Sequence, residues 1–236
     1  MRWAVLSAPD ASKDPGLRGE LNELSVDVMV DTESWRWADR RTWDAPKWAS
    51  LPTKPASCFD GTDKWVRDYV RSDLLFQANL GVGAYLLPAW FPHPKGSAAD
   101  TIEQVTEAGL GLVGSEVEVK PVVGGLALRR DGLHQCAELG GRLHGALSAA
   151  YVLLSPWDPA HDPVDRLSSA ARVLLGIEDA GIQVVVGRGG GIGVALRGLG
   201  LSAAEAGLAE GEAFDQASAV ASSLPRQPAA GDEDKK

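Results

Sequence analysis

The stretch from Ile182 to Gly193, which reads IQVVVGRGGGIG, decides the fold expected for this 236-residue chain. Residues 184–186 are three consecutive valines, which are typical of a strand buried on both faces. A glycine-rich turn follows at 187–193, and the apolar spacing of residues 194–199 predicts a short helix. A strand, a glycine turn and a helix together form one β/α unit.

Similar units precede this stretch. Short apolar runs predict strands at Tyr85–Phe91, Val117–Val123 and Ala150–Ser155, with further candidates at Trp3–Leu6, Asp27–Asp31 and Ala203–Leu208. Apolar residues at helical spacing predict helices at Trp65–Phe76, Ile102–Ala108, Leu133–Leu147 and Val164–Ile177. Strands that alternate with helices indicate a parallel sheet with right-handed crossovers.

About seven candidate strands lie close to the eight of a closed (β/α)8 barrel of the TIM type. We therefore expect an α/β chain with this barrel, complete or lacking a unit, and keep an open doubly wound parallel sheet as the alternative. The barrel domain is expected to span residues 1–222, with a Trp-rich insertion at about 35–63. Residues 223–236 offer little to bury and are expected to form a disordered acidic tail.

Composition narrows the classes of partner. The chain has 23 Lys and Arg against 32 Asp and Glu, a net charge of -9. General nucleic-acid binding is disfavoured, because it depends on basic surfaces, although a local basic pocket stays open. The sequence lacks a long apolar run and a secretory signal, so we expect a cytoplasmic protein without a membrane segment. A homo-oligomer remains open.

The glycine turn predicts an anion site. Glycines leave backbone N–H groups free to meet a phosphate at a helix start, and a guanidinium in the turn adds a bidentate contact. The residues concerned are Gly187, Arg188, Gly189, Gly190 and Gly191. The alternative is that tight packing alone requires the glycines. A dinucleotide site is disfavoured, because too few β/α units follow the turn.

Polar side chains at the ends of the predicted strands are the candidates for chemistry. Asp31 and Glu33 follow one strand and are candidate general acids or bases, and His93 is a candidate proton shuttle. Lys120, within an apolar run, is a candidate Schiff-base or anion-binding group, unless it lies at an edge and extends to solvent. Trp157 follows another strand and is a candidate ligand contact.

Two further features bear on the site. Trp35, Trp37, Trp43 and Trp48 are clustered in the sequence and either stack a flat ligand or fill a core, of which we favour the core. The cysteines show no zinc-ligand spacing, so no metal site is expected. No cofactor is expected either.

The region from Gly187 to Gly193, continued by residues 198–200 and 203–207, resembles the closing units of phosphate-binding TIM barrels. Within that class the chain is loosely similar to the tRNA-guanine transglycosylase family, without that family's zinc-binding cluster. The resemblance implies a strand-end acid at Asp31 and a base-binding turn at Gly124, Gly125 and Leu126. It places Glu205 where the family has a nucleophilic Asp.

Together these features predict an enzyme that acts on a small anionic, phosphorylated or nucleobase-bearing ligand at the carboxyl rim of the barrel. Transferase, lyase or glycosyl-transfer chemistry would draw on the strand-end carboxylates. The alternative is a non-catalytic barrel that serves as a binding or assembly module, with the Trp-rich segment as its contact surface.

Overall fold

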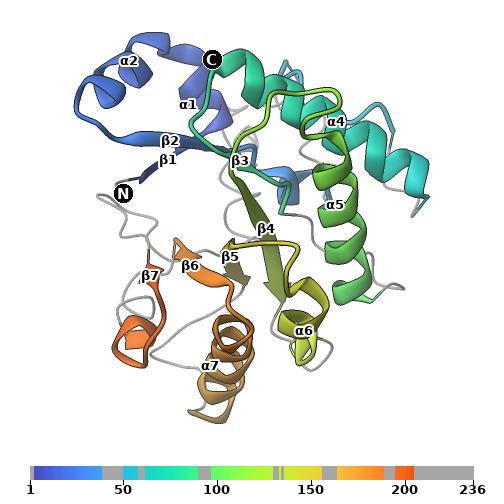
Figure 1. The fold of residues 1–236 in the computed structure, drawn as a ribbon, viewed down its shortest axis with the longest axis vertical. Coiled ribbons are helices and arrows are strands. Elements are labelled where there is room, and N and C mark those ends of the chain that lie inside the picture. The colour runs from blue at the N-terminus through green and yellow to red at the C-terminus, as the bar shows by residue number, and fades with distance from the viewer. Residues whose placement is uncertain are drawn as a thin grey trace, which may run out of the picture.

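The computed structural model describes residues 3–38, 50–57, 62–89, 97–129, 133, 136–155, 164–188 and 195–204. Helices and strands alternate along the chain, which confirms the α/β class (Figure 1). The elements are β1 (Trp3–Ser7), α1 (Ala8–Lys13), α2 (Pro15–Glu23), β2 (Asp27–Asp31), the 3-10 helix η1 (Ser34–Ala38), α4 (Asp63–Leu80), β3 (Tyr85–Leu86), α5 (Ala98–Leu112), β4 (Val122–Arg129), α6 (Leu139–Leu143), β5 (Ala149–Ser155), α7 (Val164–Asp179), β6 (Gln183–Gly187) and β7 (Ala203–Ala204).

All strand pairs are parallel, and their spatial order follows the chain. β1 pairs with β2, and β3 to β7 form a five-stranded sheet in the order β3-β4-β5-β6-β7. The Gly83 N–H, just before β3, donates to the Val28 carbonyl of β2 at 2.9 Å. This bond joins the pair to the larger sheet, so β2 and β3 lie next to each other.

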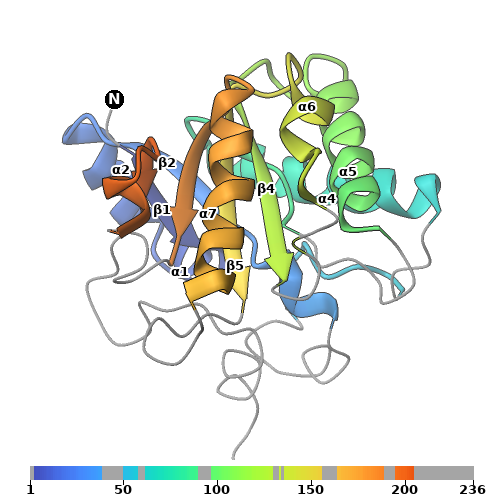
Figure 2. The same ribbon diagram turned by 90° about the horizontal axis from the view of Figure 1, so that it is seen from below.

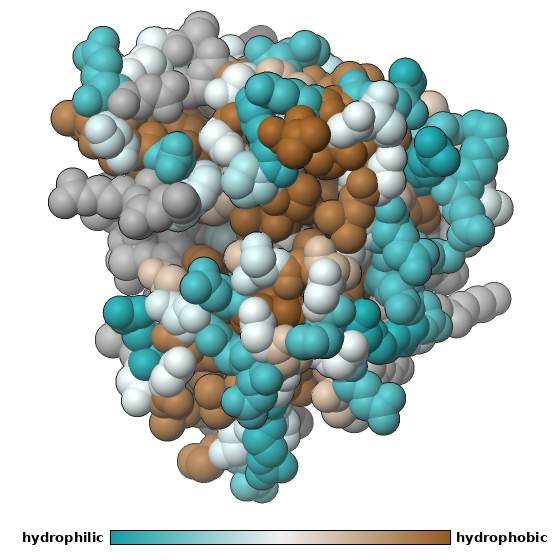
Figure 3. All heavy atoms as spheres, viewed as in Figure 1, coloured by the Kyte–Doolittle hydropathy of each residue, from teal (hydrophilic) through white to brown (hydrophobic). Residues whose placement is uncertain are grey.

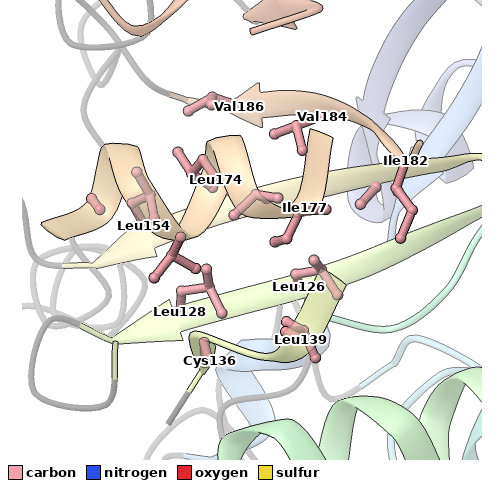
Figure 4. Close-up of a cluster of buried hydrophobic side chains, with 14 of the residues drawn as sticks. Leu126, Leu128, Cys136, Leu139, Leu154, Leu174, Ile177, Ile182, Val184 and Val186 are labelled. Carbon is pink, nitrogen blue, oxygen red and sulfur yellow. The ribbon is translucent and has the colours of Figure 1, made fainter. Parts of the chain in front are cut away.

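Helices α6 and α7 cover one face of β4, β5 and β6 (Figures 2 and 4). Alternate strand side chains point at them, as the two-residue period of a strand requires. The packed side chains include Leu126, Leu128, Leu139, Leu154, Leu174, Ile177, Val184 and Val186. Full burial of each such side chain is worth about 1.5–3 kcal/mol relative to exposure.

The opposite face of the strands is buried as well. Its apolar side chains, here named the inner cluster, are Met29, Trp35, Ala84, Leu86, Ala89, Val123, Ala127, Tyr151 and Leu153. Along β5, Tyr151 and Leu153 belong to the inner cluster while Val152 and Leu154 pack on the helix side. Both faces of β5 therefore lie in apolar surroundings, as expected of a parallel strand.

Three predicted helices are confirmed, each within a longer observed one. Residues 65–76, 102–108 and 164–177 lie within α4, α5 and α7. The Thr62 side chain accepts a hydrogen bond from the Trp65 N–H at 3.2 Å and so caps the start of α4. Gly81, with φ at +65°, ends the same helix in the left-handed conformation that favours glycine.

The strand predicted at Val117–Val123 is correct only for Val122 and Val123, because β4 covers Val122–Arg129. Val117 makes only an isolated bridge with Val113. Gly124 and Gly125 therefore lie inside a strand and not in a turn, which corrects the base-binding turn expected there. A Cβ atom on Gly125 would lie 1.9 Å from the Leu87 carbonyl oxygen, so close approach of β3 requires a glycine.

Other predicted boundaries change as well. β3 ends at Leu86, two residues before Pro88, which has no N–H to donate to a neighbouring strand. Within the predicted helix at Leu133–Leu147, the described residues form an α-helix only over α6. The strand at Ala203–Leu208 is observed as β7 over its first two residues. The rest of that strand and the expected tail at 223–236 lie outside the described residues.

Figure 3 shows apolar side chains over β3 and the connection from α5 to β4, with hydrophilic side chains around them. Val119 in this connection is 77% exposed.

Among the helices described, none combines the length and apolar composition that a membrane span requires.

The packing of Gly125 predicts a large effect of a small change. Gly125→Ala should destabilise the protein by about 3 kcal/mol, because the new methyl group collides with backbone atoms that cannot rotate away. Urea denaturation of both proteins measures the difference. Gly176→Ala in α7 is the matched control, since a Cβ atom at Gly176 would meet no neighbouring segment within 4 Å.

The control should raise stability by about 0.5–1 kcal/mol, because alanine favours the helix over glycine. An unchanged denaturation midpoint for Gly125→Ala would contradict the position of β4.

Candidate functional site

Asp31 and Glu33 lie at the carboxyl end of β2, and Arg188 follows the carboxyl end of β6. In a parallel sheet all carboxyl ends lie at one edge, where β/α enzymes carry their chemistry.

An ion pair joins the carboxyl ends of β2 and β6. Arg188 Nη2 binds Glu33 Oε1 and lies 3.7 Å from Asp31 Oδ2. The Nε–H group of Arg36 donates to the other oxygen of Glu33, Oε2. The side chains of Asp31 and Glu33 are 5% and 4% exposed, against 26% for Arg188. Arg188 is therefore the part of this group that faces solvent.

The backbone after β2 aims the acids at this position. The Glu33 N–H donates to Asp31 Oδ1 at 2.7 Å, which closes a tight turn of the Asx type. Ser34 Oγ donates to the Ala89 carbonyl at 3.1 Å and fixes η1 against the residues after β3. Glu33 and Arg188 have φ values of +51° and +50°. Non-glycine residues rarely adopt this conformation, and such strain is concentrated at functional sites.

Aromatic rings lie next to the ion pair. The Arg36 and Arg188 guanidinium carbons lie 4.3 and 5.9 Å from the centroid of the Trp35 ring. Tyr151 is packed against Gly187, since a Cβ atom there would lie 2.2 Å from Tyr151 Cζ. Gly187 thus has a packing reason to be glycine, whatever the ligand. Close contacts between guanidinium and indole are favourable as stacking and cation–π interactions.

The structure confirms the core interpretation for part of the Trp-rich segment. Trp35 and Trp37 are buried, so neither can form the exposed contact surface expected for an assembly module. Trp43 and Trp48 lie outside the described residues.

The positive charges of Arg36 and Arg188 balance the negative charges of Asp31 and Glu33. Burial alone would lower the pKa of Arg188, but Asp31 and Glu33 raise it above its ordinary value. Arg188 therefore stays protonated, with its charge already matched by two carboxylates. That arrangement weakens the expectation that Arg188 holds a phosphate, because a second anion would compete with Asp31 and Glu33.

A second polar layer lies behind the ion pair on α4. Gln77 accepts from the Leu86 N–H at 2.9 Å, and its amide nitrogen donates to the Leu86 carbonyl at 2.7 Å and to Asp73 Oδ2 at 2.8 Å. The side chain of Asp73 is fully buried. Burial raises the pKa of Asp73 to about 7, Asp31 adds to the rise, and hydrogen bonds from Thr32 and Gln77 oppose it.

Tyr69 lies one turn before Asp73 on the same helix. Burial and the charge of Asp73 raise the pKa of Tyr69 well above its ordinary value. The phenol is therefore protonated at neutral pH. Tyr69 and Asp73 together surround the buried end of β2 with groups that can hold protons.

Lys120 lies apart from this site. It precedes β4, at the opposite end of the strands from Asp31, and is not in a strand as expected. Lys120 Nζ donates to the Val82 carbonyl at 3.0 Å and pairs with Glu118 Oε2 at 3.1 Å. The structure therefore does not bring Lys120 together with Asp31 and Glu33. Gly124 and Gly125, within β4, are explained by packing.

Several predicted site residues lie outside the described residues: His93, Trp157, Gly189, Gly190, Gly191 and Glu205. Within the part of the chain that the structure describes, no three His, Cys, Asp or Glu side chains are grouped to hold a metal ion.

Sequence reasoning missed Arg36, Asp73 and Gln77. A signal for the last two was present, because they continue the inward stripe of α4 that Val66 and Val70 begin. A polar side chain on a buried helical stripe needs a partner inside the protein, and marks a candidate site for that reason.

The raised pKa of Asp73 predicts a pH dependence of stability. Folded Asp73 holds a proton up to about pH 7, whereas its ordinary pKa is 3.8. Its contribution is therefore fully present below the ordinary pKa and is lost as pH rises through about 7. The slope is at most about 1.4 kcal/mol per pH unit. Asp73→Asn should remove that slope, which urea denaturation at a series of pH values measures.

Glu116→Gln is the control, because Glu116 should change stability with pH in the opposite direction to Asp73. A hydrogen bond from Arg71 lowers the pKa of Glu116, so the wild type should gain stability over this variant as pH rises through the acid range. A stability difference between wild type and Asp73→Asn that does not change with pH would exclude a raised pKa at Asp73.

Comparisons with known proteins do not extend this geometry, because no protein-family model, curated protein or solved structure matches the chain. The resemblance to phosphate-binding barrels and to tRNA-guanine transglycosylases stays a prediction. Function has to be argued from Asp31, Glu33 and Arg188 themselves.

Proposed function

We propose that the chain is a β/α-barrel enzyme in which β1 to β7 are consecutive strands of the barrel wall. The strand order supports this, because it follows the chain without the reversal that a doubly wound sheet has at its switch point. The inner cluster supports it as well. Apart from Trp35 of η1, its members come from strands or the residues beside them, as in the side-chain layers inside a barrel.

The ion pair between Arg188 and Asp31 supports a sheet that curves as the wall of a barrel does. β3, β4 and β5 separate β2 from β6, so in a flat sheet these two strands would lie about 19 Å apart at about 4.8 Å per step. The tip of the Arg188 side chain, Nη2, nevertheless lies 3.7 Å from Asp31 Oδ2. The two side chains cover only part of the separation expected for a flat sheet, so a sheet that curls toward its inner face accounts better for the contact.

The proposed activity is acid–base chemistry on a small ligand at the carboxyl rim. The observation that carries it is the buried pair Asp31 and Glu33, held at the rim by arginines from two separate elements. Carboxylates so placed can accept and return a proton, and Asp73 behind them titrates near neutral pH. Transferase, lyase or glycosyl-transfer chemistry fits these groups, and a cytoplasmic location belongs to the same proposal.

Among the expected ligand classes, a nucleobase-bearing ligand fits these residues better than a phosphate. A heterocycle with N–H groups donates to carboxylates and stacks on guanidinium planes. Arg188 is the partly exposed guanidinium beside Asp31 and Glu33, whereas Trp35 is buried beneath it. A phosphate needs cations that are not already paired, whereas Arg36 and Arg188 both bind Glu33.

A thermal-shift screen tests this function. Nucleobases and nucleosides should raise the melting temperature of the wild type and should lose that effect in Asp31→Asn and Glu33→Gln, because the N–H acceptors are weakened. Inorganic phosphate should give no comparable shift. Any ligand that binds is then incubated with the wild type and the mixture is examined by mass spectrometry for product.

Glu118→Gln serves as the control, since Glu118 is an exposed acid at the other end of the strands. A phosphate response that is lost in Arg188→Ala and retained in Asp31→Asn would instead support the anion site and overturn this proposal.

A further inference from the structure

We propose that Asp31 and Glu33 recognise a ligand that carries a planar guanidinium or amidinium group, and that Arg188 occupies this position in the ligand-free protein. This inference rests on the proposed function, because it names the ligand class of the same site. Arg188 then acts as an internal substitute for the ligand, and binding exchanges one planar cation for another.

The contacts of Glu33 allow this exchange. Arg36 binds Oε2, whereas Arg188 binds Oε1. If Arg188 withdrew, Arg36 would still hold Glu33 in place, and Glu33 Oε1 and Asp31 Oδ2 would face the position that Arg188 Nη2 occupies now. Two carboxylate oxygens on one side of a site suit the parallel N–H groups of a guanidinium or amidinium.

Exposure identifies Arg188, and not Arg36, as the exchangeable partner. Arg188 is 26% exposed and its two carboxylates are almost completely buried. Arg36 is 8% exposed and lies within η1. A ligand from solvent therefore meets Arg188 before it meets Arg36.

The backbone at Arg188 favours its release. Its φ of +50° is a conformation that side chains with a Cβ atom rarely adopt, so the ion pair holds the residue there against a local preference. Once a ligand cation takes over the carboxylates, that preference favours movement of Arg188 away from the site.

The aromatic and electrostatic surroundings favour a flat cation. Arg188 Cζ lies 5.9 Å from the Trp35 ring centroid, so a ligand guanidinium in the same place keeps a cation–π contact. The chain has a net charge of -9, which attracts cations and repels anions at a distance.

Calorimetric titration of the full chain with ethylguanidinium chloride tests the inference, with ethylammonium chloride at equal ionic strength as the comparison. The wild type should bind ethylguanidinium more tightly than ethylammonium. Arg188→Ala should bind ethylguanidinium at least about tenfold more tightly than the wild type does, because no Arg188 side chain competes for the carboxylates. Glu33→Gln combined with Arg188→Ala should lose the binding.

Arg142→Ala is the matched control. Arg142 also bridges two carboxylates, Asp100 and Glu103, but does so on the surface between α5 and α6. This variant should bind ethylguanidinium as the wild type does. If Arg188→Ala fails to fold, Arg188→Lys replaces it, and should also bind more tightly than the wild type because an ammonium cannot form the planar contact.

Two outcomes overturn the inference. Binding to Arg188→Ala without binding to the wild type would make Arg188 a permanent structural partner. Equal binding by Arg188→Ala and Arg142→Ala would show that Arg188 does not compete with the ligand for the carboxylates. Either result leaves the nucleobase screen unaffected. The opposite combination would refute the proposed function alone. In that case the wild type binds ethylguanidinium, but Asp31→Asn leaves every nucleobase response unchanged.

Discussion

The structure depends on the contact of Arg188 with Asp31 and Glu33, because this contact joins the ends of two strands, β2 and β6, that are not neighbours in the sheet. Two carboxylates at the end of β2 are withdrawn from water almost completely. A buried charge without a partner is strongly destabilising, so the fold has to bring cations to it. Arg36 comes from the adjacent turn, whereas Arg188 comes from the end of a strand, 155 residues after Glu33 in the chain. Satisfying these charges therefore brings the ends of β2 and β6 together above the inner cluster.

Much of this architecture could be predicted from local patterns. The helices α4, α5 and α7 have apolar residues at helical period, and the strand at Asp27–Asp31 is a short apolar run between two acids, so sequence alone locates them. The position of β4 could not be found in this way. Gly125 is explained by the carbonyl of Leu87 and Gly124 by the side chain of Leu147, and these contacts exist only after the chain has folded. The β-branched residues before β4 gave a stronger local signal for the wrong position.

The same limit applies to the site. Asp31, Glu33 and Arg188 were identifiable as strand-end residues, since parallel strands place their carboxyl ends at one edge. Their mutual pairing was not identifiable, because a list of strand ends does not say which of the side chains there meet. Arg188 was therefore interpreted as a contact to an external anion, whereas the structure pairs it with internal ones. Asp73 and Gln77 entered the site through α4, from a helical stripe that apolar side chains dominate.

The polar layer on α4 bears on which ligand the site tolerates. Asp73 stands behind Asp31, and the negative charge of Asp31 helps to raise the pKa of Asp73. An anionic ligand that drew Arg188 away from Asp31 would leave two carboxyls close together with less positive charge beside them. A cationic ligand that replaced Arg188 would keep the number of charges around Asp31 and Asp73 unchanged. The buried layer can then remain as it is while the exposed position is exchanged, which is why the electrostatics favour a cation at the rim.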